Sequence, residues 1–559
     1  MSDSPHTFNL IDEPWLPVRR RGGGVEHIPP WRITDGLAED PIVAFAWPRP
    51  DFNGAAHELL IGLLATTAAS EDDDAWEDWW FEPPEPDILG SRFAAVSHAF
   101  DLDGPGPRFL QDADPLDDVE SKDIAGLLID TPGAQTLHNN ADLFVKRGAA
   151  PVFGRRAAAM ALFTLSSYAP SGGAGHRTSL RGGGPMTTLI AATHREHGDV
   201  LWGRLWPNVE TRRQIDARIT DSRRNDDPEL IFPWLAPTRT SNPKAGGGPT
   251  TPADTHPLQV YWGMPRRIRL RFEDSQGRRC GLTAANEPVV VASYRTRNYG
   301  VNYSDGFRHP LSPYYRQNAK SAVRLPVHPT PGGISYRLWP GFVVPSKDRL
   351  REPAQVIRHW LSERGRMSGD ARFAAFGYDM DNMKARAWME GEMPLLRFDA
   401  AAREWIEEFI ARATAGANTV ARLLTGAVKS ALVDRPRDAA GDYGFIAEQF
   451  FRETEAGFHS ALGEVIPATR EESETDWPLV DTLRRWAPVM AGAAVRLFDE
   501  YAPWEGLEDR DMHRHVKARF FLTLALGGRG ATGKALFDGD LGIPSPETVR
   551  SRSRGKETA

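Results

Sequence analysis

The fold of this chain is decided by a stretch in its last third, Trp405-Ile-Glu-Glu-Phe-Ile-Ala-Arg-Ala-Thr-Ala-Gly-Ala-Asn-Thr-Val-Ala-Arg-Leu-Leu424. Its large apolar residues recur at spacings of three and four, which places them on one stripe of a helix. Three further segments repeat this pattern, within residues 446–462, 483–498 and 516–526. Because amphipathic helices of this kind bury their apolar stripes against one another, the pattern predicts a four-helix bundle over residues 396–546.

The residues before this bundle have a different character, since they are rich in proline, glycine and tryptophan and show only short periodic segments. Residues 8–18 are typical of a strand followed by an extended segment, and three glycines at 22–24 would turn the chain back. Residues 59–64 carry four leucines at helical spacing. A second helix is expected over Ala157–Tyr168, and it must end before Pro170.

The mixed first part and the helical last part of the sequence together predict an α+β protein. A large mixed domain is expected over residues 1–395, followed by the helical bundle, with no internal repeat. The polar and basic residues 547–559 are expected to form a disordered tail.

One strand of the mixed domain should present a basic face. Side chains alternate between the two faces of a strand, so residues 261–272 would divide into two sets. One set is mostly apolar and consists of Arg266, Ile268, Leu270 and Phe272. The other set is basic and consists of Arg267, Arg269 and Arg271.

Composition excludes several classes of protein. The 559 residues carry a formal net charge of −8, which argues against a protein that coats nucleic acid through a uniformly basic surface. Local basic clusters still permit binding through patches. The single cysteine, Cys280, excludes an intramolecular disulfide and cysteine-based zinc sites. With no apolar run of membrane-spanning length and no secretory signal, we expect a cytoplasmic protein that does not enter a membrane.

The sequence contains one string that imitates a catalytic motif. Residues 528–534, Gly-Arg-Gly-Ala-Thr-Gly-Lys, match the first part of the phosphate-binding loop, but Ala535 replaces the serine or threonine that reaches magnesium. Only 24 residues follow position 535, too few for the strands that this fold requires. His513 and His515 point to different sides if their segment is helical, so they are not expected to bind a metal. We therefore expect no enzymatic activity, no cofactor and no metal site; the alternative is a stand-alone nuclease or nucleotide hydrolase.

A glycine-rich stretch is the most informative segment for function. It runs from Tyr168 to Thr188 as Tyr-Ala-Pro-Ser-Gly-Gly-Ala-Gly-His-Arg-Thr-Ser-Leu-Arg-Gly-Gly-Gly-Pro-Met-Thr-Thr. Glycines let a backbone approach a ligand closely, and His176, Arg177 and Arg181 add hydrogen-bond donors. The composition is equally typical of a loop that contacts phosphate or a nucleic-acid groove and of a flexible surface loop.

Three stretches together resemble CasA, the large subunit of the type I-E CRISPR Cascade complex. They are Phe8-Asn-Leu-Ile-Asp-Glu-Pro-Trp-Leu-Pro-Val18, the segment from Ala169 to Thr188, and His256-Pro-Leu-Gln-Val-Tyr-Trp-Gly-Met264. The resemblance implies a non-catalytic subunit at the 5′ end of the CRISPR RNA. It also implies recognition of the protospacer-adjacent motif (PAM) in double-stranded target DNA, opening of that duplex, contacts with other Cascade subunits and recruitment of a helicase–nuclease.

The resemblance also implies which residues contact DNA. The glycine loop that approaches the minor groove falls on Ser171, Gly172, Gly173, Ala174 and Gly175, of which Ser171 and Ala174 depart from an all-glycine pattern. The wedge that enters between the parting strands falls on Asp381, Asn382 and Met383, with Asn382 in the place of the family's glutamine. The family's lysine finger falls within Tyr294–Asn298, where no lysine occurs and Arg295, Arg297 and Asn298 are the candidates.

The loop that contacts the CRISPR RNA should lie within His138–Arg147. Its candidates for base and phosphate contacts are Asn139, Asn140, Phe144, Lys146 and Arg147. Some relatives carry cysteine pairs that could hold zinc, but this chain has Phe153-Gly-Arg-Arg156 at one such place, so no metal is expected.

Overall fold

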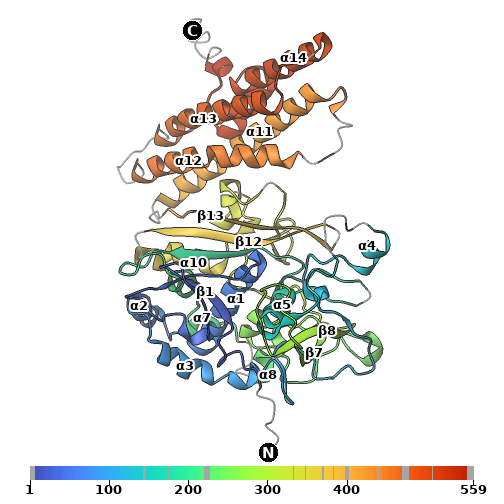
Figure 1. The fold of residues 1–559 in the computed structure, drawn as a ribbon. Helices are drawn as coiled ribbons and strands as arrows, with labels where there is room; N and C mark the ends of the chain where they lie inside the picture. Colours follow the sequence, from blue (N-terminus) through green and yellow to red (C-terminus); the bar gives the residue numbers. More distant parts are fainter. Residues whose placement is uncertain are drawn as a thin grey trace, which may run out of the picture. The chain divides into compact units, whose positions relative to one another are not determined.

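A computed structural model of the chain forms two compact units (Figure 1). It describes residues 7–140, 142, 147–173, 175–219, 227–331, 333–346, 348–367, 370–381, 383–396, 402–436, 441, 443–468, 477–506 and 508–549. The first unit comprises Met1–Pro329 and Ala354–Glu390, and the second comprises Thr330–Pro353 and Gly391–Ala559. The chain therefore passes between the units three times. The expected domain limit at 395 did not anticipate that residues 330–353 belong with the helical unit.

The first unit begins with a small antiparallel sheet in the order β2-β1-β3. Its strands are β1 (Leu16–Arg20), β2 (Val25–Ile28) and β3 (Ile42–Phe45). The register pairs Leu16 with Ile28 across the turn that contains Gly23, whose φ is 91°. The expected turn at the three glycines is therefore confirmed, because a positive φ suits glycine.

Helices form the centre of this unit. Both expected helices are present, as α1 (Pro50–Thr67) and α5 (Arg155–Tyr168), and they pack against each other with largely buried side chains. Beside them, α2 (Asp73–Phe81), α6 (Trp202–Leu205) and α10 (Gln355–Ser362) contribute buried tryptophans. Trp76 stacks on Trp80 and on Trp206, at centroid distances of 6.2 and 5.9 Å. Aromatic burial on this scale is a large part of the packing energy of the unit.

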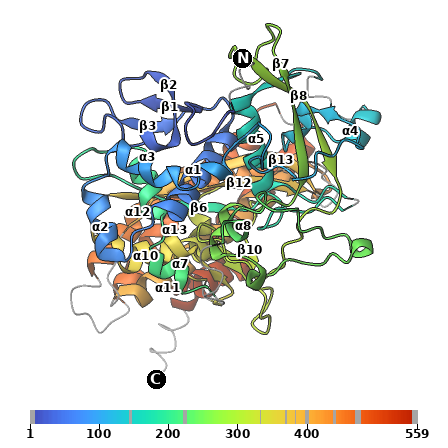
Figure 2. The same ribbon diagram turned by 90° about the horizontal axis from the view of Figure 1, so that it is seen from below.

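Two sheets carry the loops of functional interest. The first has the order β13-β12-β6, with β6 (Thr187–Ala192), β12 (Ala371–Asp381) and β13 (Lys384–Pro394). The second contains β4 (Lys122–Asp123), β5 (Phe153–Gly154), β7 (Arg267–Asp274) and β8 (Val289–Arg297). Strands β7 and β8 lie side by side in Figure 2, in antiparallel register.

The expected strand over 261–272 is wrong in its first part. Residues Pro257–Tyr261 form a 3₁₀ helix, and β7 begins only at Arg267 because Pro265 precedes it. From there the expected alternation is present: Ile268 and Leu270 are buried, whereas Arg271 is exposed. The register shifts after Arg271, at a bulge.

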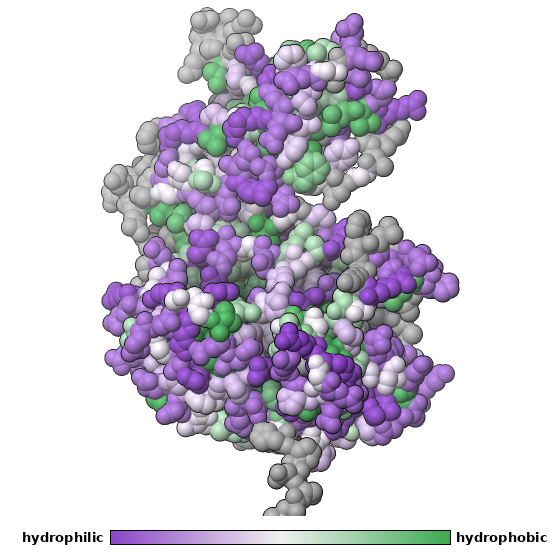
Figure 3. All heavy atoms as spheres, in the orientation of Figure 1, coloured by the Kyte–Doolittle hydropathy of each residue, from purple (hydrophilic) through white to green (hydrophobic). Residues whose placement is uncertain are grey.

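Shorter elements complete the first unit and its connections. They are α3 (Pro86–Ala94), α4 (Ala134–His138), α7 (Arg212–Asp216), α8 (Pro228–Ile231), β9 (Tyr314–Tyr315) and β10 (Leu325–Pro326). On the face drawn in Figure 3, apolar side chains reach the surface only in separate spots among hydrophilic ones.

The second unit confirms the expected helical bundle. Its long helices are α11 (Arg403–Leu432), α12 (Gly444–Ala468), α13 (Trp477–Tyr501) and α14 (Asp509–Leu526), followed by α15 (Gly530–Lys534) and a π-helix (Ala535–Leu541). Helix α11 packs against each of the other three long helices. The inserted segment adds α9 (Trp339–Phe342) and β11 (Arg351–Glu352). In the part of the chain that the structure describes, no helix has the length and apolar character needed to cross a membrane.

The start of the expected tail is folded. The Thr548 hydroxyl donates a hydrogen bond of 2.7 Å to Asp538, and the backbone N–H of Ser545 donates to the same carboxylate. Residues 550–559 lie outside the described part of the chain.

Candidate nucleic-acid interface

The glycine-rich segment between α5 and β6 is tied together by its own backbone. At its base, the N–H of Gly184 donates to the carbonyl of Tyr168 at 2.8 Å, and the N–H of Ser179 donates to Ala169 at 3.0 Å. Nearer the tip, the N–H of His176 donates to the carbonyl of Gly173 at 2.8 Å. Of the two interpretations left open above, these bonds favour a preformed loop for its described residues. Ala174 lies outside them.

Glycine serves different structural purposes at different positions of this loop. A Cβ at Gly172 would lie 2.7 Å from the Cβ of His176, and a Cβ at Gly175 would lie 2.9 Å from the Tyr299 ring. Both positions therefore need glycine for internal packing. Gly173 has a φ of 67° and nothing within 4 Å of where its Cβ would lie. Gly173 is thus the described position at which the loop backbone is open to a ligand, while Ser171 is half-buried beside it.

The base of the loop contains a buried charged cluster. Arg181 pairs with Glu58 at 2.5 Å, and both side chains are almost fully buried. The Tyr168 hydroxyl and the Thr187 hydroxyl also donate to Glu58, and burial together with the Glu58 charge raises the pKa of Tyr168 well above its usual value. The expectation that Arg181 offers a donor to a ligand is therefore wrong, because its donors are used inside the protein. Removing one partner of such a pair typically costs about 3–5 kcal/mol.

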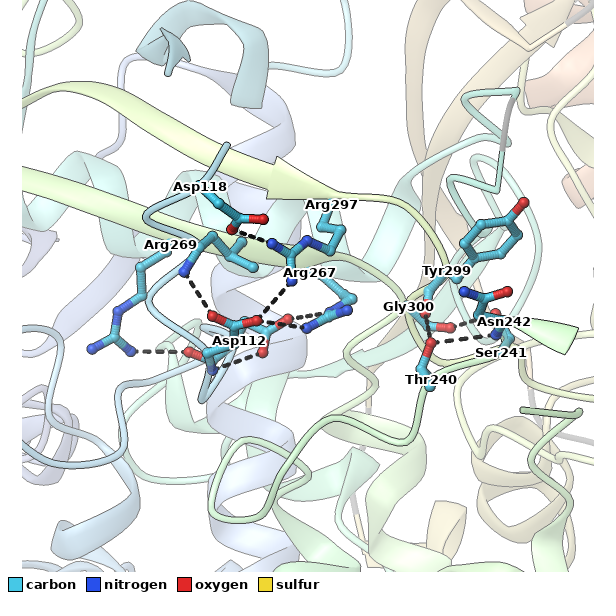
Figure 4. Close-up of polar contacts among 12 residues, drawn as sticks. Asp112, Asp118, Thr240, Ser241, Asn242, Arg267, Arg269, Arg297, Tyr299 and Gly300 are labelled. Atoms are coloured by element: carbon cyan, nitrogen blue, oxygen red, sulfur yellow. Dashed lines mark hydrogen bonds and ion pairs between the residues drawn. The ribbon is translucent and has the colours of Figure 1, made fainter. Parts of the chain in front are cut away.

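Tyr299 joins the glycine loop to a second loop, around residues 240–248. Its N–H donates to the carbonyl of Gly175 at 2.8 Å, and its carbonyl accepts from the Thr240 hydroxyl at 2.9 Å and the Ser241 N–H at 3.2 Å. The Tyr299 backbone has a φ of 63°, which is uncommon for a residue with a side chain. Figure 4 shows Tyr299, Thr240 and Ser241 close together beyond the end of β8. Sequence reasoning missed this second loop, although its run Lys244-Ala-Gly-Gly-Gly248 repeats the composition of the first.

Four basic side chains lie in or close to the glycine loop. The Arg177 side chain donates to the Ser241 hydroxyl at 2.9 Å, and that of Arg266 donates to the carbonyl of Pro170. Burial lowers the pKa of Arg266 to about 10. Burial, and then the charges of Arg266 and Lys122, lower the pKa of His176 to about 4. His176 is therefore neutral at pH 7, and Lys122 on β4 lies near enough for its charge to act on this ring.

Arg295 and Arg297, two of the candidates for the place of the family's lysine finger, are held in ion pairs, and Figure 4 shows Arg297 beside Asp118. Arg297 binds Asp114 at 2.8 Å and also binds Asp118. Arg295 binds Asp117, which lies 3.6 Å from Arg271 as well. Asn298 is half-buried and follows directly.

The expected basic face of β7 is neutralised by the same segment. Arg267 pairs with Asp112, and Arg269 donates to the Asp112 carbonyl at 3.0 Å. Four carboxylates from residues 112–118 thus cover a face that its own strands make strongly basic. Ion pairs that reach solvent are worth about 0–1 kcal/mol each, so most of these contacts are weak individually.

Two of the wedge candidates, Asp381 and Met383, lie between β12 and β13 where these strands form a hairpin. Asp381 ends β12 and is exposed, and Met383 follows with a φ of 67° and 54% exposure. Asn382 lies outside the described residues. An exposed apolar side chain at the end of a hairpin is suited to entering between base pairs.

The hairpin and the glycine loop emerge from the same end of one sheet. β6 begins at Thr187, which pairs with Phe376, so residues 377–381 extend beyond the start of β6. Their bases are in contact, because a Cβ at Gly184 would lie 2.6 Å from the Tyr378 carbonyl and one at Gly377 would lie 2.5 Å from the Pro185 carbonyl. The Tyr378 hydroxyl also donates to Asp51 at 2.5 Å, which fixes this base to α1. Two motifs about 200 residues apart in sequence therefore share one scaffold.

The candidates for CRISPR RNA contacts are only partly described. Phe144 and Lys146 lie outside the described residues. Arg147 donates to Asp142 and, at 3.1 Å, to Asn140, so hydrogen bonding raises the pKa of Arg147 and lowers that of Asp142. Asn139 and Asn140 are exposed after α4, and the φ of Asn140 is 50°.

The string that imitates a phosphate-binding loop connects two helices. Helix α14 ends at Leu526, Gly528 follows with a φ of 68°, and α15 begins at Gly530. A phosphate-binding loop instead connects a strand to a helix, so the expectation of a glycine-terminated bundle helix is confirmed. His513 and His515 lie on α14, where His515 is buried and bonds to the carbonyl of Ala502. No group of three or more potential metal ligands occurs among the residues whose placement the structure describes.

Comparison with known proteins identifies the family. The model of the CRISPR-associated protein Cse1 family matches residues 9–497. Cse1 from Acidimicrobium ferrooxidans aligns with a TM-score of 0.63 and 17% identity over 94% of this chain and 98% of that one. CasA from Thermus thermophilus gives 0.64 and 19% over 93% and 99%, and a chain of a CRISPR RNA-guided surveillance complex gives 0.60 and 16% over 93% and 100%.

These structural likenesses show the fold, and the family match covers most of the sequence. A Thermus thermophilus structure carries both names, as CasA (Cse1), so the resemblance to CasA and the family match agree. The chain therefore belongs to the CRISPR-associated Cse1 family.

Proposed function

We propose that this protein is the non-catalytic large subunit of a type I-E Cascade complex and recognises the PAM in double-stranded target DNA. Its partners would be the CRISPR RNA, the other Cascade subunits, the target DNA and a helicase–nuclease that degrades it. Family membership supports the place in a CRISPR system. The observation that carries the proposed DNA contact is the shared scaffold, which projects the glycine loop and the wedge hairpin from one end of one sheet.

The glycine loop and the hairpin would have different roles in binding the target. The loop backbone at Gly173 is open, so it can approach a minor groove, where the pattern of donors and acceptors is degenerate and several PAMs are tolerated. The hairpin turn at Asp381–Met383 would enter where the strands part, and its apolar side chain would replace lost stacking. Base pairing with the guide RNA would then read the remaining sequence.

The test is a substitution at the open glycine. Gly173→Asp adds negative charge where the groove should approach, and aspartate tolerates a positive φ better than most residues. In the complex reconstituted with CRISPR RNA and partner subunits, affinity for PAM duplex should fall by about 1–3 kcal/mol, the usual cost of a lost groove contact. The measurement is a binding curve at one fixed salt concentration.

A matched control is available on another turn. Gly277 has a φ of 80°, also has nothing within 4 Å of its would-be Cβ, and lies at the opposite end of β7 from Arg267. Gly277→Asp should leave binding unchanged. Equal affinities for the wild type and Gly173→Asp would reject this loop as the DNA contact.

A further inference from the structure

The acidic segment Asp112–Asp118 competes with DNA phosphate for the same guanidinium groups. Carboxylate and phosphate oxygens accept the same hydrogen bonds from arginine. We infer, on the basis of the proposed function, that Asp117 and Asp118 determine specificity: they keep Arg295 and Arg297 from binding DNA that gains no contact at the glycine loop.

The segment is held in place independently of its outer ion pairs. At its start, the Asp112 N–H donates to the carbonyl of Ile268 at 2.8 Å, which attaches the backbone to β7. Leu116 is fully buried and anchors the middle. Shortly beyond its end, β4 pairs with β8 in a register that places Lys122 opposite Tyr294. Asp117 and Asp118 therefore remain beside the arginines even when their side chains rotate away.

The carboxylates lie on the solvent side of the guanidiniums. The side chains of Asp117 and Asp118 are 70% and 75% exposed, whereas those of Arg295 and Arg297 are 15% and 32% exposed. An approaching duplex therefore meets negative charge before it reaches the arginines. Repulsion of this kind suppresses wrong partners, because only a ligand with additional favourable contacts can compensate for it.

The position of the segment relative to the other site elements fits this role. Arg295 and Arg297 end β8, and Tyr299, two residues further on, holds Gly175 of the glycine loop. Figure 4 shows Arg297 and Tyr299 following one another on this segment. DNA bound at the glycine loop would therefore lie close to the masked arginines. Rotation of the Asp117 and Asp118 side chains, with no movement of backbone, would expose the Arg295 guanidinium and one side of the Arg297 guanidinium to its phosphates. Asp114 would keep its own pair with Arg297 at 2.8 Å.

The experiment compares PAM duplex with a scrambled duplex of equal length. The double variant Asp117→Asn, Asp118→Asn keeps side-chain size and removes the charge, and it is assembled into the complete complex. Affinity for scrambled duplex should rise about tenfold and affinity for PAM duplex should rise less, so the ratio of the two falls. The salt dependence of scrambled-duplex binding should steepen by about one unit of slope for each arginine freed.

Two further variants decide the outcome. Glu273→Gln removes the partner of Arg278, at 2.8 Å on the far part of β7, and should change neither affinity nor slope. Adding Arg295→Ala and Arg297→Ala to the double variant should abolish the gain. A double variant that is as thermally stable as wild type but has an unchanged affinity ratio would overturn the inference, as would a gain that survives loss of both arginines. If Gly173→Asp weakens PAM binding in that case, the proposed function stands while this inference fails.

Discussion

Arg181 and Arg297 illustrate how partners decide the role of a residue type. Both are arginines near a glycine-rich loop, and the sequence made both of them candidates for ligand contacts. Arg181 is buried against Glu58, where its loss would leave a charge unpaired in the interior. Arg297 is partly exposed and is held by Asp114 and Asp118, so its pairing can be exchanged.

Lys122 should contribute a phosphate contact beside the glycine loop. It is exposed on β4, and its charge helps to lower the pKa of His176. Lys122→Ala should weaken PAM and scrambled duplex equally and reduce the slope of the salt dependence by about one. The control is Lys534→Ala, which removes an exposed lysine of the motif-like string in the helical unit. Unequal losses on the two duplexes would assign Lys122 to base recognition instead.

His176 should make stability depend on pH. Its folded pKa is about 4, below the usual value of 6.5, so the unfolded chain binds more protons between these values. The contribution of the neutral His176 ring to the free energy of unfolding is therefore fully present above pH 6.5 and is lost as the pH falls towards 4. Because this ring is only half-buried, we expect His176→Gln to recover about 1 kcal/mol of the loss between about pH 7 and pH 5, measured by urea denaturation. An identical loss in both proteins would contradict the role of this ring.

At the scale of elements, substitutions in the β12–β13 hairpin and in the glycine loop should impair different steps of DNA binding. Asn382→Ala removes a polar side chain at the hairpin turn, so strand opening should fall more than initial duplex binding. A target with a pre-opened bubble should rescue it, because the unstacking cost of a few kcal/mol is already met. The same bubble should rescue Gly173→Asp poorly if PAM docking is still required. Comparison of R-loop yields on duplex and bubble measures this difference, and equal rescue of both variants would reject the division of roles.

At the scale of the whole molecule, the helical unit includes residues 330–353, which the sequence pattern did not assign to it. Tyr336, from the inserted segment 330–353, stacks on Phe458 of α12 at 4.4 Å and bonds to the Thr454 hydroxyl at 2.8 Å. Trp339 of the same segment donates to the sulfur of Met393 at 2.8 Å. The inserted segment therefore supplies part of the core of the helical unit.

Tyr336→Ala should destabilise the helical unit by about 3–5 kcal/mol, since it removes a fully buried aromatic side chain. Thermal unfolding followed by far-ultraviolet circular dichroism should show an earlier loss of helix. Tyr336→Phe keeps the stacking and should cost only about 1 kcal/mol, the usual contribution of one hydrogen bond. A small loss for Tyr336→Ala would mean that the bundle does not depend on the insertion.

The local sequence pattern determined much of the secondary structure of this protein. The spacing of apolar residues was sufficient for the four long helices, because a helix buries one stripe whatever it packs against. Gly23 was enough for the first turn and Pro170 for the end of α5, since both act on the backbone where they stand. Three short motifs were also enough to indicate the family to which the chain belongs.

Only the tertiary structure decided which charges are free. Glu58 pairs with Arg181, which is 123 positions away in sequence, and Asp118 pairs with Arg297, which is 179 positions away. Periodicity records whether a residue is buried or exposed, but it carries no information about which distant side chain lies opposite. The neutralised face of β7 and β8, the role of Tyr299 and the insertion of Tyr336 all depend on such long-range meetings. They follow from packing of the complete chain, which brings together segments whose local sequences are independent of each other.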